Sequence, residues 1–499
     1  MKTSLSSTIA ALLALTSAGC VVGPNYHPLL LDMPRQWTEA PQSRGQSPPY
    51  PIAWWESFKD PELDSLMRRA ARQNLGVQSA EARIREARAR RIIAAAPLWP
   101  GLNTSASYTR LWQDEDLFGP LRAGDQPVII GAQPQNLFQA GFDASWELDL
   151  FGGTRRSIEA ARADLEASFY DRGDVLLALL AEVARNYVEM RGFQKQLDIA
   201  RTNVAAQRDI LELTRSRYQG GLATDLDVAR AEAQVKTTGS QIPVLETAYK
   251  DAIHRLSVLL GQQPGSLVNE LRKPGPISVV TVELPPDLPS DLLRQRPDIR
   301  RAERQLAAAT ARVGVATAEL YPKFSLIGTA GFESLAASDF FNSSSKLWSI
   351  GPSISWPIFR GGQIVGTIQV RDAQEQQALI TYRQSILNAL EEVENALVAY
   401  TREQERRAEL ADAVEANERA AASARDLYLG GLSDFLNVLQ AQRDLFQSQT
   451  ELERSDAAVS VDFVALHKAL GGGWEAAHTA ITFARPASST LPAFLGRNP

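Results

Sequence analysis

Two short stretches of alternating sequence decide the fold of this chain. The first is Phe138-Gln139-Ala140-Gly141-Phe142-Asp143-Ala144-Ser145-Trp146-Glu147-Leu148, and the second is Trp348-Ser349-Ile350-Gly351-Pro352-Ser353-Ile354-Ser355-Trp356-Pro357-Ile358. In both, apolar side chains alternate with polar or small ones, a period of two that predicts a β-strand with one apolar face. Each apolar face carries two aromatic residues eight positions apart, which are Phe138, Trp146, Trp348 and Trp356.

The spacing of these aromatic residues matches the height of a membrane. At about 3.3 Å per residue and a tilt near 40°, eight steps span roughly 20 Å, like an outer-membrane apolar band between two aromatic girdles. Weaker strand patterns precede them near 104–112 and 324–332. The alternative interpretation of these strands is the edge of a soluble sandwich.

Four strands cannot close a membrane barrel by themselves. The smallest such barrels have about eight strands, and an open sheet edge is not tolerated in lipid. The chain is therefore expected to oligomerise and to share its barrel among protomers. Two copies would supply eight strands and three would supply twelve, and strand arithmetic does not choose between them.

Long helices follow the strands. Apolar residues recur at helical spacing over about 154–217 and 363–428, and the last helix places Leu445, Leu452, Val459 and Leu466 at intervals of seven. Such a pattern, sustained well beyond 25 residues, indicates coiled-coil packing. On the helices alone a long soluble helical hairpin would be the preferred interpretation, and the strands decide against it.

The chain is a tandem repeat. Ala80-Glu81-Ala82-Arg83 recurs as Ala302-Glu303-Arg304-Gln305, 222 positions later, and Tyr218-Gln219-Gly220-Gly221-Leu222 recurs as Tyr428-Leu429-Gly430-Gly431-Leu432, 210 positions later. Self-similarity of this kind identifies a duplicated unit. The predicted organisation is a signal peptide at 1–19, a lipidated extended segment at 20–61, a first repeat at 62–261, a Pro-rich segment at 262–289, a second repeat at 290–471 and a tail at 472–499.

The N-terminus carries an export signal. Lys2 precedes a mostly apolar run that ends near Leu15, and small residues then lead directly to Cys20. This pattern predicts a secretory signal, and its end resembles a bacterial lipobox that would be cut before Cys20. A diacylglyceryl group on the thiol and a second chain, such as palmitate, on the new N-terminus would give stable anchoring. Val21, where Asp would favour inner-membrane retention, points to the outer membrane. The alternative is an ordinary signal peptide with an incidental cysteine.

Composition excludes several classes of protein. The 499 residues are 44% hydrophobic and 22% charged with a net charge of −6, and no apolar run reaches 18 residues, which excludes an inner-membrane transporter. One cysteine permits no intramolecular disulfide, and no basic block suits nucleic acid. No Ser/His/Asp set, nucleotide loop or metal-spaced histidines are present, so we expect no enzyme activity, cofactor or metal site. His254 and His467 are interpreted as surface or packing residues.

Four motifs in order resemble a known family. They are Cys20–Tyr26, Trp54–Leu63, Leu292–Glu303 and Lys468–Trp474. Together they resemble a TolC-like outer-membrane factor of the NodT-type lipoprotein branch. The resemblance implies a homotrimer, with a twelve-stranded β-barrel in the outer membrane continuous with a long periplasmic α-helical barrel. It also implies a passive efflux conduit that joins a periplasmic adaptor and an inner-membrane pump of the resistance-nodulation-division type.

The resemblance also assigns candidate site residues. It places the adaptor-contacting tip at Gly220, Gly221, Leu222, Gly430, Gly431 and Leu432, and the periplasmic gate at Arg217, Tyr218, Asp227, Tyr428, Asn437 and Gln440. A plain interhelical turn is the alternative for the first set, and a carboxylate at a helix N-terminus is the alternative for Asp227. Relatives often have Asp at the positions of Asn437 and Gln440, so we expect a gate with weaker cation selectivity and weaker divalent block. Three copies of Asp227 would still form a ring of carboxylates that favours cations.

Other functions remain open on the sequence alone. A channel of this kind could serve ATP-driven (type I) protein secretion, although the lipobox and the Leu470-Gly471-Gly472-Gly473-Trp474 ending favour the efflux branch. A pore-less, lipid-anchored coiled-coil scaffold is a second alternative, and an exported enzyme is a third. The sequence is silent on the transported substrates and on which pump and adaptor take part.

Overall fold

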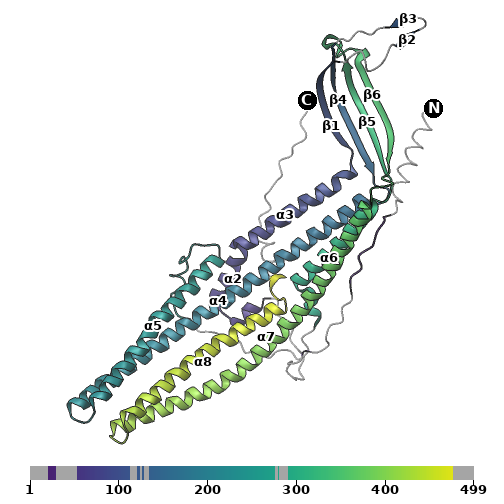
Figure 1. Cartoon of the computed structure of the whole chain (residues 1–499). Coiled ribbons are helices and arrows are strands. Elements are labelled where there is room, and N and C mark those ends of the chain that lie inside the picture. Colours follow the sequence, from purple (N-terminus) through teal and green to yellow (C-terminus); the bar gives the residue numbers. More distant parts are fainter. Residues whose placement is uncertain are drawn as a thin grey trace. The chain divides into compact units, whose positions relative to one another are not determined.

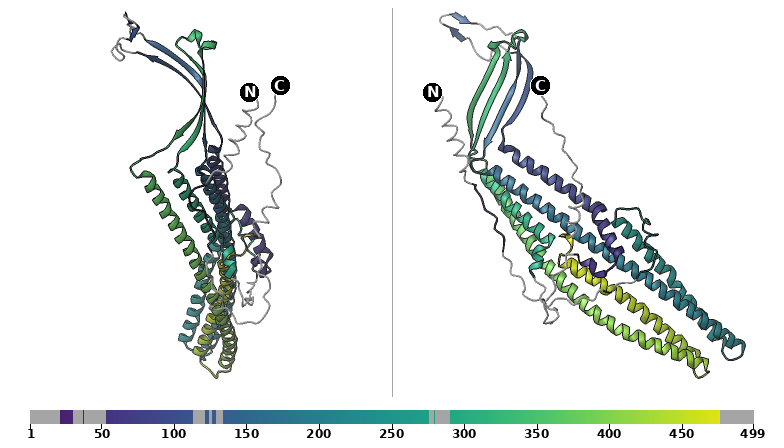
Figure 2. Two further views of the ribbon diagram at one scale, coloured as in Figure 1. Left: turned by 90° about the vertical axis from the view of Figure 1, so that its right-hand side faces the viewer. Right: turned by 180° about the vertical axis from the view of Figure 1, so that it is seen from behind.

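The computed structural model describes residues 21–29, 37, 53–112, 121–123, 126–128, 134–275, 279 and 290–475. The predicted signal peptide, the lipid-attachment residue Cys20 and most of the predicted tail lie outside these residues. Figures 1 and 2 show the chain from three sides. Among the described helices, none combines the length and the apolar character that crossing a membrane requires.

The order of elements displays the duplication. The first half contains η1 (Trp54–Phe58), α2 (Pro61–Gln73), α3 (Leu75–Ala95), η2 (Ala96–Leu98), β1 (Gly101–Leu111), β2 (Leu121–Ala123), β3 (Gln126–Val128), β4 (Gln135–Leu148), α4 (Gly153–Gln219) and α5 (Asp225–Leu259). The second contains η4 (Ser290–Gln295), α6 (Pro297–Ala318), β5 (Lys323–Ser334), η5 (Ala337–Asp339), η6 (Ser343–Ser345), β6 (Lys346–Ser355), α7 (Gln363–Leu429) and α8 (Phe435–Ala469). Helix, strand pair, very long helix and long helix therefore occur twice.

The four predicted strands form one antiparallel sheet in the order β1-β4-β5-β6 (Figure 1). Phe138 pairs with Tyr108 on one side and with Ser334 on the other. Strand β6 ends at Ser355, shorter than the alternation suggested, because Pro357 has no amide to continue the ladder. The sequence also missed the short β2–β3 ladder in the loop that joins β1 to β4.

Two tryptophans of the predicted girdle have equivalent anchors. The indole of Trp146 donates to the carbonyl of Leu98 at 3.0 Å, and that of Trp356 donates to the carbonyl of Leu320 at 3.1 Å. Each indole thus ties its strand to the turn that follows the preceding helix. Trp348 has 77% of its surface exposed, whereas Phe138 is half-buried and packs against the Tyr108 ring in a tilted arrangement.

The chain forms two compact units, each assembled from separate stretches of sequence. The first comprises residues 1–29, 85–167 and 303–381, and it holds the four-stranded sheet. The second comprises residues 30–84, 168–302 and 382–499, and it holds the ends of both long hairpins. In the second unit Trp54, Phe463 and His467 pack together as a buried aromatic cluster, so His467 is the packing residue expected from the sequence.

The long helices lie close to their predicted limits. Helices α4 and α5 form one hairpin, and α7 and α8 form the other, and the two lie side by side (Figures 1 and 2). Of the predicted seam residues in α8, Val459 and Leu466 are fully buried and Leu445 and Leu452 are half-buried. Helix α8 contacts the first hairpin through polar pairs such as Asn203 with Gln449, 3.1 Å apart.

Candidate functional site: the tips of the two helical hairpins

The two hairpins turn with the same hydrogen bonds. In the first, Leu222 N donates to Arg217 O at 2.8 Å and Gly221 N to Tyr218 O at 2.9 Å. In the second, the same two bonds run from Leu432 N to Leu427 O at 2.9 Å and from Gly431 N to Tyr428 O at 3.1 Å. This nested pair satisfies the last carbonyls of a helix.

The second glycine of each turn is required by the backbone. Gly221 has a φ of +75° and Gly431 a φ of +72°, a left-handed conformation that side chains with a Cβ rarely adopt. Gly220 and Gly430 do not adopt a positive φ. The Gly-Gly pair therefore allows the chain to reverse direction at once between two coiled-coil helices.

The turns present apolar side chains to solvent. Leu222 and Leu432, which directly follow the glycines, are 70% and 79% exposed. Leu226 and Leu436, at the first turns of α5 and α8, are more than half exposed. Clustered exposed leucines on an otherwise polar element are typical of a protein-binding surface.

Arg217 joins the first hairpin to the second. Its Nη1 donates to the carbonyl of Tyr428 at 3.0 Å and to that of Leu429 at 3.4 Å, and its guanidinium carbon lies 4.6 Å from the centre of the Tyr428 ring. The guanidinium thus stacks on an aromatic face while it caps the end of α7, where carbonyls lack helical partners.

A small apolar core supports this contact. Nine buried residues from all four helices pack together immediately above the turns. They are Val204, Ile210, Leu211, Ala231, Val235, Tyr428, Phe435, Val438 and Leu439. Tyr428 is only 4% exposed, and its hydroxyl has no hydrogen-bond partner among the described residues. The tip therefore retains a buried polar group that the protomer leaves unsatisfied.

Asp227 takes part in a capping box at the start of α5. Its backbone amide donates to Thr224 Oγ1 at 3.2 Å, and its Oδ2 accepts from the Thr224 amide at 3.1 Å and from the Thr224 hydroxyl at 2.7 Å. This arrangement stabilises a helix N-terminus. The carboxylate is half-buried, and its Oδ1 has no hydrogen bond within the described chain.

Two candidate gate residues of the second hairpin are neutral and bonded locally. Asn437 donates its amide to Ser433 Oγ at 3.0 Å, and Gln440 donates to Asp444 Oδ1 at 2.8 Å. Both side chains are exposed. Helix α8 begins after Asp434 without a side-chain cap. At these two candidate gate positions the second hairpin therefore contributes no carboxylate.

The duplication breaks at the Arg217 contact. Tyr218 and Tyr428 are equivalent by sequence, yet Tyr218 is 47% exposed whereas Tyr428 is buried. The position equivalent to Arg217 is Leu427, which is exposed. The sequence did show that one copy has Arg where the other has Leu. That difference is the signal from which an asymmetric link between the hairpins could have been predicted.

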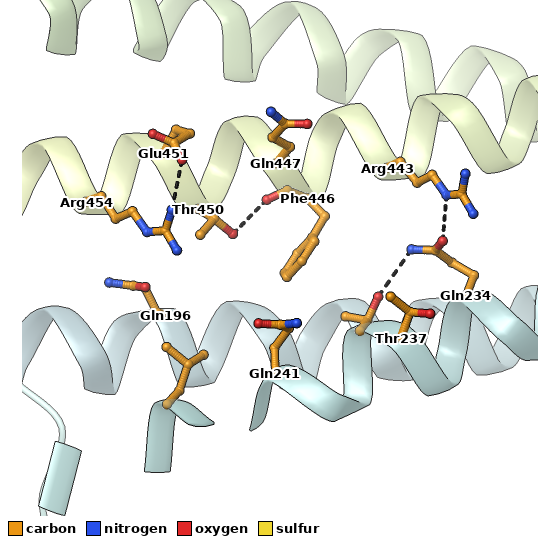
Figure 3. A pocket seen from close by; sticks show the side chains of 12 residues that line it. Gln196, Gln234, Thr237, Gln241, Arg443, Phe446, Gln447, Thr450, Glu451 and Arg454 are labelled. Atoms are coloured by element: carbon orange, nitrogen blue, oxygen red, sulfur yellow. Dashed lines mark hydrogen bonds and ion pairs between the residues drawn. The ribbon is translucent and has the colours of Figure 1, made fainter. Parts of the chain in front are cut away.

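A polar groove lies between the hairpins above the tip. Its volume is about 520 Å³, and residues of α4, α5 and α8 line it. Figure 3 shows Arg443 and Arg454 at its two ends with Phe446 and Gln241 between them. Arg443 Nε donates to Gln234 Oε1 at 2.6 Å, which fixes one end of the groove. Sequence reasoning did not single out these residues, because they share no recognisable motif.

Across the described part of the chain, no cluster of three or more His, Cys, Asp or Glu could hold a metal ion.

Comparison with known proteins agrees with this architecture. The family model described as outer membrane efflux protein matches residues 66–262 and 288–472. Nodulation protein T of Rhizobium leguminosarum biovar trifolii is 33% identical over 466 residues, which cover 92% of this chain and 96% of that protein. The pyoverdine export outer membrane protein OpmQ of Pseudomonas aeruginosa is 34% identical over 471 residues, covering 94% and 97%.

Solved structures show the same fold. The outer-membrane channel OprN superimposes with a TM-score of 0.83 at 35% identity, covering 91% of this chain and all of that one. CusC gives a TM-score of 0.78 at 27% identity. These matches confirm the predicted fold class, mainly helical with a strand portion that contributes to an outer-membrane channel. The chain belongs to the outer membrane efflux protein family, and it is an outer-membrane channel component of an efflux system in a Gram-negative bacterium.

Proposed function

We propose that this chain forms, as a homotrimer, the passive exit duct of a tripartite efflux system. Three copies of the β1-β4-β5-β6 sheet supply a twelve-stranded barrel. A periplasmic adaptor connects the duct to an inner-membrane pump of the resistance-nodulation-division type. The pump supplies the energy, and the duct catalyses no reaction. After export, acylated Cys20 anchors each protomer in the outer membrane.

The exposed leucines at the tips carry the adaptor assignment. Leu222 and Leu432 stand beyond left-handed glycines that accept no bulkier residue without strain, so the turns are narrow and their ends are apolar. A partner that covers both turns would bury these two leucines. At about 25 cal/mol per Å² of apolar area, such burial favours docking.

The gate assignment rests on the position of the residues beside the turns. Arg217 and Tyr428 close the two hairpins on each other, whereas Tyr218 remains exposed and available to another protomer. Asp227 contributes a free carboxylate oxygen, and Asn437 and Gln440 contribute amides. Three copies of one carboxylate per protomer give a modest preference for cations.

Site-specific cross-linking in cells tests the tip. Leu222→Cys places a thiol on an exposed side chain, and acylation of Cys20 would leave it as the chain's only free thiol. We expect a short bifunctional cross-linker to join it to a periplasmic adaptor. The matched control is Glu415→Cys, an exposed position on α7 away from the turn. Adaptor capture at Glu415 but not at Leu222 would contradict the tip assignment.

Two measurements separate the remaining alternatives. Single-channel conductance and heat-modifiable migration in gels are expected of a pore and not of a coiled-coil scaffold. Identification of the pump recovered with the Leu222→Cys adaptor complex distinguishes efflux from ATP-driven secretion. Recovery of an ATP-binding-cassette transporter alone would replace the efflux assignment by type I secretion.

A further inference from the structure

The first residues after Cys20 make specific contacts with the rest of the first unit. The amide of Val22 donates to the carbonyl of Phe151 at 3.2 Å, so the segment is joined to the turn between β4 and α4. In Figure 1 this segment is the dark purple trace near α6. A lipid anchor can hold a protein at a membrane through a flexible tether, so anchoring alone does not require this contact.

Arg156 holds this segment through three of its four side-chain hydrogen bonds. It is 2% exposed, and its Nε donates to Val22 O at 3.1 Å. Its Nη2 donates to Gly23 O at 3.2 Å and to Asn25 Oδ1 at 2.7 Å, and Nη1 donates to Glu159 at 2.8 Å. A buried guanidinium is costly unless its donors are satisfied, and here three of the four acceptors belong to the N-terminal segment.

Two glycines let the segment approach closely. Gly23 has a φ of +87°, and a Cβ there would lie 2.5 Å from the Cα of Gly314 on α6. A Cβ on Gly314 would in turn lie 2.9 Å from the side chain of Arg156. Side chains at either position would therefore separate the two backbones. We call Gly23, Arg156 and Gly314 with their contacts the N-terminal seat.

Tyr26 closes the far end of the segment. Its hydroxyl donates to Glu303 at 3.2 Å, and the guanidinium carbon of Arg304 lies 5.4 Å from its ring centre. The ring packs on the small residues Ala163, Ala307 and Ala308, which leave room for it between α4 and α6. Polar and apolar contacts thus hold the segment at both ends.

The seat is present in only one of the two repeats. At the offsets of the duplication, Gly314 corresponds to Ile92 and Arg156 corresponds to Gly366. Ile92 is 69% exposed, and a Cβ on Gly366 would meet nothing within 4 Å. Because a duplicated unit inherits its helix packing, a departure at both positions indicates that the seat serves the single N-terminus rather than the fold of the repeat.

We propose that the N-terminal seat is a docking site for residues 21–26 that positions the acyl anchor on Cys20. Val21 contacts Gly152, where a Cβ would lie 3.0 Å from the Val21 Cα, and Cys20 is about 3.8 Å further along the chain. Its lipid is thereby held at the β4–α4 turn, at the foot of the sheet. An undocked six-residue tether would let Cys20 move over roughly 13 Å. This inference rests on the proposed acylation of Cys20.

Hydrogen exchange on the purified, full-length channel tests the docking. In the wild type we expect peptides covering 21–26 to exchange slowly, and Gly314→Leu and Arg156→Gln to raise their exchange at least about ten-fold. The control Gly366→Leu places the same side chain at an open helical position of the other repeat, the one that corresponds to Arg156, and should leave these peptides unchanged. Fast exchange in the wild type, or protection that persists in Gly314→Leu, would overturn the docking site.

A photoactivatable fatty acid supplied to the cells tests the anchor. Its acyl chain on Cys20 should cross-link to the sheet near the β4–α4 turn in the wild type and in Gly366→Leu, and to scattered peptides in Gly314→Leu. The same pattern in all three would show that the seat does not position the lipid. Mass spectrometry of Cys20 distinguishes failure of this inference from failure of the proposed function. An unmodified thiol would contradict both the lipid anchor and the positioning role of the N-terminal seat. Capture of an adaptor at Leu222→Cys would still support the exit duct.

Discussion

Arg217 at the end of the first long helix lies over the ring of Tyr428 at the end of the second, with 4.6 Å between the guanidinium carbon and the ring centre. The two residues are 211 positions apart, and they join the hairpins directly above their turns. The same guanidinium donates to the carbonyls of Tyr428 and Leu429, so one side chain makes both contacts. We therefore expect the mobility of the tips to depend on this pair.

Replacing Arg217 should loosen the tips. Arg217→Gln loses the stacking on Tyr428 and weakens the cap on α7, which together are worth about 1–2 kcal/mol. We expect a broader distance distribution between spin labels at Leu222→Cys and Leu432→Cys, measured by pulsed electron paramagnetic resonance, and a larger mean conductance. Arg215→Gln is the control, because Arg215 pairs with Glu212 and Glu232 of its own hairpin. Equal broadening in both variants would contradict the prediction.

Removing the hydroxyl of Tyr428 should be tolerated. The hydroxyl is buried without a partner among the described residues, so Tyr428→Phe removes an unsatisfied group and keeps the ring. We expect the thermal midpoint of the trimer and the exchange of peptides near 428 to be unchanged or improved. Tyr428→Leu should be less stable by about 1 kcal/mol or more, because it loses the aromatic contacts with Arg217 and Phe435. A marked loss in Tyr428→Phe would show that the hydroxyl bonds to another protomer.

The charge of Asp227 should contribute to ion selectivity. Asp227→Asn keeps an acceptor for the Thr224 hydroxyl and removes three negative charges from a trimer, so we expect a lower cation preference in bilayer recordings under a salt gradient. Asp225→Asn, at an exposed neighbour on the same helix turn, controls for general surface charge. Selectivity that is equal in the wild type and Asp227→Asn would remove Asp227 from the gate and leave it a capping role.

Asp462 should destabilise the protein at neutral pH. Burial, with the nearby Glu403 carboxylate, raises the pKa of Asp462 to about 6. Because this pKa is above that of the unfolded chain, the folded state binds the proton more tightly. The resulting stability is fully present below pH 3.8 and is lost as the pH rises through 6.

The variant Asp462→Asn tests this pH dependence. It should raise stability by about 1 kcal/mol at pH 7.5, a value reduced for the partial exposure of the side chain. The gain should vanish near pH 4, where the wild-type carboxyl is neutral. Thermal unfolding at both pH values measures it, with the exposed Asp412→Asn as the control. An equal shift at both pH values would mean that packing rather than ionisation causes it.

Local patterns predicted the elements well. The period-two segments became β4 and β6, and the heptad-like segments became α4, α7 and α8, because side-chain periodicity follows from backbone geometry that neighbouring residues share. The Gly-Gly turns were predicted for the same reason, since a left-handed backbone at Gly221 and Gly431 is a local requirement. The end of β6 was predicted too late, because the alternation of apolar and polar residues continues past Pro357. This proline has no amide to donate to the next hydrogen bond of the ladder.

The sequence by itself determined the duplicated order of strands and helices, the position of the turns and the family. Tertiary structure alone decided which of two equivalent residues makes a long-range contact. Tyr428 is buried under Arg217 while Tyr218 is exposed, and Arg156 receives the N-terminal segment while Gly366 receives nothing. These differences arise from contacts between residues more than 130 positions apart. Periodicity carries no record of such contacts, because they depend on how separately formed helices pack against each other.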